Sequence, residues 1–167
     1  PMKQPRAIAR RAAQGQPATG YGWPGIKVRW CTGQLKTHLI AKEVNRLKKE
    51  KNALHYIGIA ADESQRCKDD PNHRYPLMEW GITEADALNY CYRRGFTWGG
   101  LYHFFSRVSC FCCPLQPLDE LRTLRRHFPD LWRRMLVMES WLPENKRRFK
   151  DSSVSALDAR FAAEEDV

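Results

Sequence analysis

The chain has 167 residues, of which 43% are hydrophobic and 28% charged, a composition that excludes a disordered chain and fits one folded domain with a sizeable core. No apolar run approaches the roughly 18 residues of a membrane-spanning helix, and no secretory signal opens the sequence, so we expect no membrane partner. The formal net charge of +9 favours polyanionic partners, namely nucleotides, phosphorylated metabolites or nucleic acid.

The first fifty residues predict a loop-rich basic segment followed by a helix. Residues 1–25 are basic and rich in Pro, Gly and Gln, with a short helix expected at 7–13 and a loop at 15–24. Apolar side chains at helical spacing then predict a helix over 35–47. The run Lys48–Lys51 closes that helix with positive charge, which suits the negative end of the helix dipole.

A buried strand is predicted at Leu54–Ala60, a short apolar run rich in β-prone residues. It leads into Asp62–Arg66, which we expect to be a polar loop at the carboxyl end of the strand, where ligands collect in open α/β sheets. Residues 67–75 are expected to form a charged loop, and Tyr75–Trp80 an extended segment.

Thr83 and Asp86 resemble a helix-capping box, with Asp in place of the usual Glu at the third helical position. The helix that begins there is predicted to run to Arg94 and to stop at Gly95. A turn is expected at Gly99-Gly100.

Two further helices are predicted at Leu118–His127 and Pro129–Trp141, and the segment from Lys146 onward reads as a charged tail with a last helix at 156–165. Together the elements predict an α/β domain. Part of a parallel sheet with flanking helices precedes a mainly helical C-terminal portion.

Crowded cysteines are the most informative feature of the sequence. Three lie in Cys110-Phe111-Cys112-Cys113-Pro114, and Cys31 lies far upstream. Packing alone rarely calls for adjacent cysteines, so they indicate a metal or redox site, and without an export signal we expect reduced thiols in the cytoplasm. Thiolates suit a [4Fe–4S] cluster, and a Cys-Pro end recurs in ferredoxin-type ligand runs.

Two alternatives remain for these four cysteines. One is structural zinc, although zinc-binding cysteine pairs usually enclose two to four residues. The other is a set of free, buried thiols. Of the remaining cysteines, Cys91 is interpreted as a core residue in a helix, and Cys67 as incidental in a charged loop.

An anion pocket is the second candidate site. Arg29 and Lys36 flank Cys31, while Glu63, Ser64 and Arg66 follow the predicted strand. Arginine and lysine can neutralise phosphate or sulfate oxygens, and arginine does so with a bidentate fork. The alternatives are a solvated basic surface and a purely structural ion pair between Glu63 and Arg66.

Five large aromatic residues could provide a surface on which bases stack. Such side chains more often fill a core, which is the interpretation we favour. These residues are Trp80, Trp98, Phe104, Phe105 and Trp132.

Four segments, in order, resemble the phosphoadenosine phosphosulfate (PAPS) reductase-like branch of the PP-loop ATP pyrophosphatase superfamily, and most closely its phage and bacterial members. The resemblance covers roughly residues 21–140. The four segments are Arg29-Trp30-Cys31-Thr32-Gly33-Gln34-Leu35-Lys36, Tyr56-Ile57-Gly58-Ile59-Ala60-Ala61-Asp62-Glu63-Ser64-Gln65-Arg66, Tyr75-Pro76-Leu77-Met78-Glu79-Trp80 with Thr83-Glu84-Ala85-Asp86, and Ser109-Cys110-Phe111-Cys112-Cys113-Pro114-Leu115. The resemblance implies an adenine nucleotide alpha-hydrolase-like fold.

One family element has no counterpart here: the Ser-Gly-Gly-x-Asp-Ser loop whose backbone amides hold nucleotide phosphates. The chain therefore resembles the C-terminal half of a family member. We divide it into a basic segment (1–25), a PAPS reductase-like domain (26–145) and a charged tail (146–167).

The resemblance implies an enzyme of sulfur metabolism or sulfur modification that carries an iron–sulfur cluster and handles ATP or adenylyl-sulfate once the N-terminal half is supplied. Thiol-driven reduction of an adenylyl-sulfate would need a mobile cysteine near the chain's end, and none follows Cys113. The other chemistry is adenylation followed by sulfur insertion into a nucleic acid or metabolite. No catalytic residue is assigned.

The competing function is a non-catalytic module that holds iron–sulfur or zinc and binds nucleic acid or a partner protein through its basic face. A separate N-terminal half, a partner subunit and a second copy of the chain are the candidate protein partners.

Overall fold

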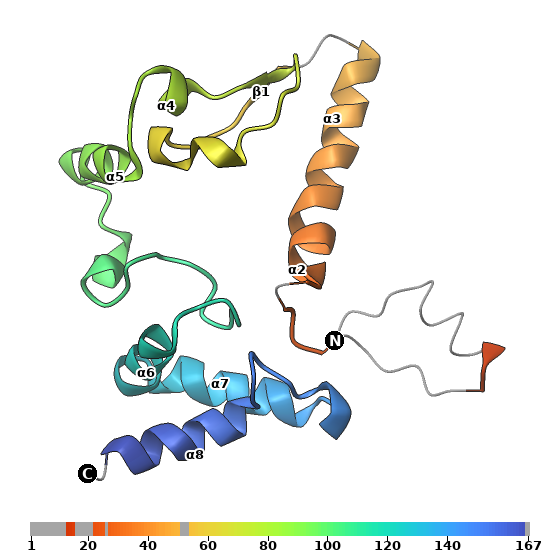
Figure 1. Cartoon of the computed structure of the whole chain (residues 1–167), viewed down its shortest axis with the longest axis vertical. Helices are drawn as coiled ribbons and strands as arrows, with labels where there is room; N and C mark the ends of the chain where they lie inside the picture. The colour runs from red at the N-terminus through yellow and green to blue at the C-terminus, as the bar shows by residue number, and fades with distance from the viewer. Residues whose placement is uncertain (1–12, 16–21, 26, 51–53, 166–167) are drawn as a thin grey trace. The chain divides into compact units, whose positions relative to one another are not determined.

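The computed structural model describes residues 13–15, 22–25, 27–50 and 54–165. The chain divides into two compact units, the first made of residues 1–32 with 102–167 and the second of residues 33–101 (Figure 1). The helix expected at 7–13 and the loop expected at 15–24 fall largely outside the described residues. Among the described helices, none is long and apolar enough to cross a membrane.

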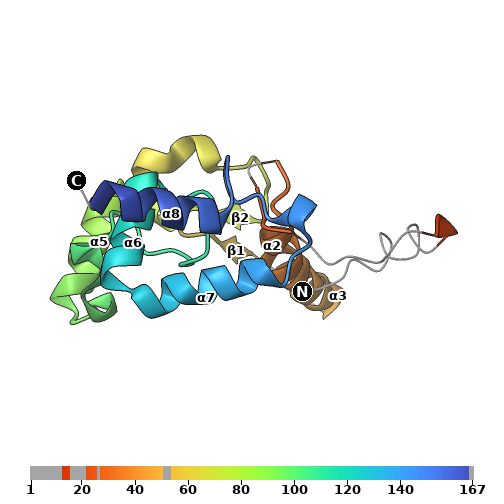
Figure 2. The ribbon, with the colours of Figure 1, turned by 90° about the horizontal axis from the view of Figure 1, so that it is seen from below.

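Three helices build the first unit: α6 (Leu118–His127), α7 (Pro129–Ser140) and α8 (Val154–Glu165). They lie side by side in both views (Figures 1 and 2). The unit also contains the short α2 (Trp30–Thr32) and η4 (Glu144–Lys146). The predicted helices are confirmed, with α8 beginning two residues before its expected start.

The core of the first unit lies where these helices pack. Its buried members are Leu121, Leu124, Trp132, Met135, Phe149, Val154, Leu157 and Phe161. Half of them come from 146–167, the segment that the sequence division set apart as a charged tail. The composition of that segment is dominated by charged residues, so composition alone does not indicate a buried face. Helical spacing nevertheless brings Val154, Leu157 and Phe161 to one face of α8.

A buried carboxylate on α7 caps the start of α8. Glu139 accepts hydrogen bonds from the backbone N–H groups of Val154 (2.5 Å) and Ser155 (3.0 Å). Ser153 Oγ accepts from the N–H of Ala156 at 3.1 Å. The first N–H groups of a helix have no partner within it, so these bonds satisfy donors that burial would otherwise leave unpaired.

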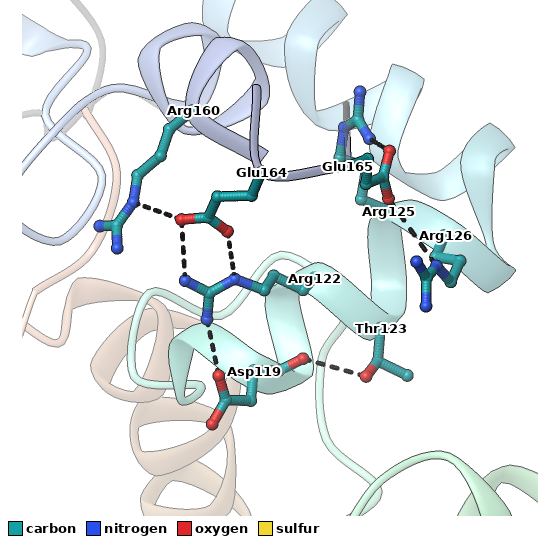
Figure 3. Close-up of polar contacts among 8 residues, drawn as sticks. All are labelled: Asp119, Arg122, Thr123, Arg125, Arg126, Arg160, Glu164 and Glu165. Atoms are coloured by element: carbon teal, nitrogen blue, oxygen red, sulfur yellow. Dashed lines mark hydrogen bonds and ion pairs between the residues drawn. The ribbon is translucent and has the colours of Figure 1, made fainter. Parts of the chain in front are cut away.

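Ion pairs join the exposed edges of α6 and α8 (Figure 3). Arg122 donates to Glu164 at 2.7 Å and to Asp119 at 2.6 Å, and Arg160 donates to Glu164 at 2.9 Å. The hydrogen bond from Arg122, and after it the one from Arg160, lower the pKa of Glu164 from 4.5 to about 2. The carboxylate is partly exposed, so the pair contributes modestly to stability.

Glu164→Gln is expected to destabilise the first unit slightly at neutral pH and not at all in strong acid. The pKa of Glu164 is lower in the folded chain than in the unfolded one, so its stabilisation is present above pH 4.5 and is lost as the pH falls toward about 2. Urea unfolding of both proteins across this pH range measures the difference. In an Arg122→Met background the substitution should have a smaller effect, because only Arg160 then pairs with Glu164. A difference that stays constant from neutral to acid pH would contradict the pairing.

The second unit contains a small parallel sheet. The strands β1 (His55–Tyr56) and β2 (His73–Arg74) pair in the register His55 with His73 and Tyr56 with Arg74. Its helical segments are η1 (Gly33–Thr37), α3 (His38–Glu50), η2 (Ala61–Arg66), α4 (Pro76–Glu79), α5 (Glu84–Arg93) and the start of η3 (Trp98–His103). The described chain is thus mixed and mostly helical, which confirms the α/β class in its coarse sense.

The predicted helix at 35–47 is confirmed and is longer, since helical residues run without a break from Trp30 to Glu50. The strand predicted at Leu54–Ala60 is confirmed only at His55–Tyr56, although Ile59 and Ala60 are buried as expected. The loop expected at Asp62–Arg66 is instead the 3₁₀ helix η2.

The extended segment predicted at Tyr75–Trp80 is wrong, because these residues form α4. The ring of a proline fixes its backbone angle φ at a value that suits a helix. At the first helical position the missing N–H is not needed, because an N–H there has no acceptor within the helix. The N–H of Glu79 donates to the carbonyl of Tyr75, and that of Trp80 to the carbonyl of Pro76, both at 2.9 Å. A single turn of helix therefore replaces the predicted strand.

The capping box at the start of α5 is confirmed. Thr83 Oγ1 accepts from the N–H of Asp86, and the Asp86 carboxylate accepts from the N–H of Thr83. Asp62 of η2 adds an acceptor for the N–H of Glu84 at 3.1 Å. The helix stops at Gly95 as predicted, where φ of +83° favours a residue without a side chain.

Candidate metal centre

Two consecutive turns bring three cysteines together in the first unit. The N–H of Cys113 donates to the carbonyl of Cys110 at 3.0 Å, and the N–H of Gln116 donates to the carbonyl of Cys113 at 3.2 Å. Phe111 and Cys112 pack against the helical core, while Cys110 is exposed. The cysteine loop (residues 109–116) is therefore anchored on one side and open to solvent on the other.

Two polar side chains fix this loop. Gln116 is buried, and its Nε2 donates to Ser109 Oγ at 3.3 Å and to the carbonyl of Cys110 at 3.2 Å. Lys150 Nζ donates to the carbonyls of Pro114 (3.1 Å) and Gln116 (2.6 Å). Neither residue is predicted from the sequence, because a lone glutamine carries no motif and Lys150 lies in a basic run typical of a solvated surface.

Cys31 lies on α2, which also belongs to the first unit. The preceding residue, Trp30, donates from Nε1 to the carbonyl of Gly22 at 3.1 Å. Trp23 packs edge-on against the buried Phe149, with ring centroids 5.0 Å apart. At Gly22 a Cβ atom would lie 2.7 Å from the carbonyl oxygen of Lys146, so only glycine allows this close approach. These contacts tie the segment before Cys31 to the same C-terminal segment that holds the cysteine loop.

The electrostatics of Cys112 connect all four predicted ligands. Burial raises the pKa of its thiol, and the neighbouring thiols of Cys110, Cys113 and Cys31 raise it further. A neighbouring thiol raises this pKa because two thiolates repel each other. The contribution of Cys31 is the smallest of the three. All six cysteines of the chain carry free thiols.

Four thiols are a suitable donor set for a [4Fe–4S] cluster or for a Cys₄ zinc ion. Both groups need thiolates, so binding would release thiol protons. Within the described part of the chain, no three His, Cys, Asp or Glu side chains are already arranged to hold a metal ion.

The predicted anion-site residues are distributed over both units. Arg29 lies in the first, whereas Lys36, Glu63, Ser64 and Arg66 lie in the second. The two Arg66 contacts to the Glu63 carboxylate are 2.5 Å long, and this hydrogen-bonded pair raises the pKa of Arg66. The structural pairing of these two residues is confirmed. The anion pocket stays a prediction.

The five aromatic residues considered as a stacking surface differ in their burial. Trp132 is buried as expected, and Phe105 packs against the core. The core interpretation is wrong for Trp80, which is 69% exposed after α4. Trp98 and Phe104 are also exposed. Outside the cysteine loop, Cys67 is half-buried, and its Sγ lies 3.4 Å from Met78 Sδ.

Comparison with known proteins gives one distant relative. No family model matches the chain, and no solved structure matches it. An uncharacterized protein of Methanocaldococcus jannaschii is 28% identical over 131 residues. The match covers 67% of this chain and 25% of that protein, so the chain spans about a quarter of the length of its relative.

Proposed function

We propose that this chain is the cluster-bearing part of a PAPS reductase-like enzyme of sulfur metabolism or sulfur modification. Its finer fold is that of an adenine nucleotide alpha-hydrolase-like domain, and its ligands to a [4Fe–4S] cluster are Cys31, Cys110, Cys112 and Cys113. The observation that carries the proposal is the environment of Cys112. Two turns of the cysteine loop hold Cys112 between Cys110 and Cys113 with its side chain packed against the core, and Cys31 is the smallest of the contributions to its raised pKa.

A bound cluster supplies electron transfer, and it links its ligand segments. The chain's own residues would hold those ligands in place. Gln116 and Lys150 fix the backbone of the cysteine loop, and Phe111 shields one side of the loop from water.

The second candidate function is a non-catalytic metal module that binds nucleic acid or a partner protein. The observation in favour of this function is a set of arginines in the first unit. Their side chains are largely exposed even though they form ion pairs. Arg126, Arg133 and Arg148 are 68%, 69% and 76% exposed. Such side chains are available to a polyanion.

Reconstitution tests the iron–sulfur proposal against the zinc alternative. We expect the chain, incubated without oxygen with ferrous iron and sulfide, to gain the broad visible absorption of an iron–sulfur cluster. Zinc added beforehand should slow this reaction, because both groups use the same thiolates. Retention of zinc with no visible absorption under reducing, iron-rich conditions would instead favour the structural zinc site.

A nucleotide titration separates the enzyme from the module. By itself, this chain is expected to bind ATP weakly or not at all, because it has no phosphate-binding loop to supply backbone N–H groups to a triphosphate. Supplying the N-terminal half with that loop, in cis or as a second polypeptide, should restore binding measured by calorimetry. Tight ATP binding by residues 1–167 alone would refute this division of labour, and no binding even with the added half would favour the non-catalytic module.

A further inference from the structure

Four large aromatic side chains are exposed at the end of α5 and in the turn after it. Tyr90 is 52% exposed, Tyr92 38%, Phe96 63% and Trp98 37%. All of them belong to the second unit and lie within nine consecutive residues. We call this stretch, residues 90–98, the aromatic–arginine segment. Scattered exposed apolar residues are ordinary, but four rings gathered in one short stretch mark a contact surface.

The backbone of this segment is well defined by hydrogen bonds. At the end of α5, the N–H of Gly95 donates to the carbonyl of Tyr92 at 2.9 Å, and the N–H of Phe96 to that of Cys91 at 3.1 Å. This ending fixes the direction in which the chain leaves the helix. The rings of Tyr92 and Trp98 meet edge-to-face, with centroids 5.7 Å apart, so the turn is also held by its side chains.

Trp98 is held in a conformation that tryptophan rarely adopts. Its φ is +49°, and those of Gly99 and Gly100 are +62° and +77°. Glycine enters this left-handed region freely, but a residue with a bulky side chain does so at a cost in free energy. Strain of this kind is concentrated at functional sites. Here it keeps a tryptophan ring partly exposed beside Tyr92.

Two positive charges lie among these rings. Arg93 and Arg94 lie between them, and the chain contains no Asp or Glu between Asp86 and Asp119. The Arg94 guanidinium carbon lies 5.2 Å from the centroid of the Tyr90 ring, a cation–π contact that leaves the charge at the surface. Arginines at the C-terminal end of a helix also complement its dipole. That effect does not account for the exposed rings.

We propose that the aromatic–arginine segment binds single-stranded nucleic acid. Two adjacent arginines with two aromatic residues on either side offer both kinds of contact that such a strand makes: bases stack on the rings, and the guanidinium groups pair with phosphates. The absence of carboxylates in this part of the sequence favours a polyanion over a basic or neutral protein partner. The proposal does not rest on the cluster, because it uses only residues of the second unit.

The test is fluorescence anisotropy of a labelled oligothymidylate of about 20 nucleotides, titrated with the full chain. Phe96→Ala and Tyr90→Ala should each weaken binding between about 5-fold and about 100-fold, the range expected for one lost base stack. Affinity falls with salt, so the slope of log affinity against log salt is negative. The double substitution Arg93→Ala with Arg94→Ala should make this slope less negative by about 1.4, since each phosphate contact on a single strand contributes about −0.7. A duplex of the same length should compete poorly.

Matched controls distinguish this surface from general attraction to a basic protein. Trp80→Ala and Trp141→Ala remove rings that are 69% and 64% exposed elsewhere, and they should leave the affinity unchanged. Cys112→Ser should also leave it unchanged, which separates this proposal from the proposed function. Three results would overturn it. The first is that the control variants weaken DNA binding as much as Phe96→Ala and Tyr90→Ala do. The second is that the unmodified chain does not bind the oligonucleotide at low salt. The third is that Phe96→Ala leaves DNA binding unchanged but abolishes self-association of the chain.

Discussion

Replacing Cys112 by serine is expected to abolish cluster binding. Cys112 is the candidate ligand that packs against the core, and the other three thiols contribute to its raised pKa. Serine has nearly the same shape but is a poor ligand for iron, so the protein should lose its visible absorption and almost all of its iron. The free energy of unfolding should fall as well, because the metal-binding energy that ties the Cys31 segment to the cysteine loop contributes to folding.

The other cysteines of the chain provide the matched controls. Cys91→Ser and Cys67→Ser make the same chemical change in the second unit, at cysteines that are not among the proposed ligands. Both variants should keep the full iron content. Equal iron loss in all three variants would show that the metal is bound without preference for the proposed ligands.

Replacing Phe149 by alanine is expected to have the largest effect on the stability of the metal-free protein. Phe149 is completely buried, packs against Trp23, and belongs to the core shared with α6, α7 and α8. Removal of a buried phenyl ring costs about 3–5 kcal/mol, since burial is lost and a cavity remains. A typical domain is stable by about 5–15 kcal/mol, so much of the first unit's stability should disappear. Urea unfolding of the metal-free protein measures this loss.

An exposed ring gives the comparison for that experiment. Trp141→Ala removes a larger side chain that is 64% exposed, and it should change the free energy of unfolding by no more than about 0.5 kcal/mol. A small effect of Phe149→Ala, comparable with that of Trp141→Ala, would mean that residues 146–167 are the charged tail suggested by composition.

The helices of this protein could be predicted well where local signals are strong. The Thr83–Asp86 capping box and Gly95 define the two ends of α5, and helical spacing locates α6 and α7. The extended segment predicted at Tyr75–Trp80 was wrong, because Pro76 occupies the first position of a short helix. The role of Phe149 could not be predicted, because its burial depends on Trp23, a long-range contact that no local pattern contains.

In the candidate site, too, residues with a local sequence pattern could be predicted and residues that act through contacts with the backbone could not. Cysteine spacing was sufficient to select Cys31 and the loop as a group, because crowded thiols have few other uses. The residues that position the loop could not be predicted. Gln116 and Lys150 act through backbone carbonyls, and any residue type presents a carbonyl, so they leave no motif in the sequence. Exposure of the aromatic–arginine segment likewise depends on tertiary structure, whereas composition alone favoured a core.

The iron, acid-labile sulfide and zinc content of the chain, purified without oxygen, tests the central claim most directly. The proposed cluster predicts a brown protein with about four iron atoms and about four sulfides per chain, and with little zinc. A colourless protein that holds one zinc per chain, or one that takes up no metal even after anaerobic reconstitution, would contradict it.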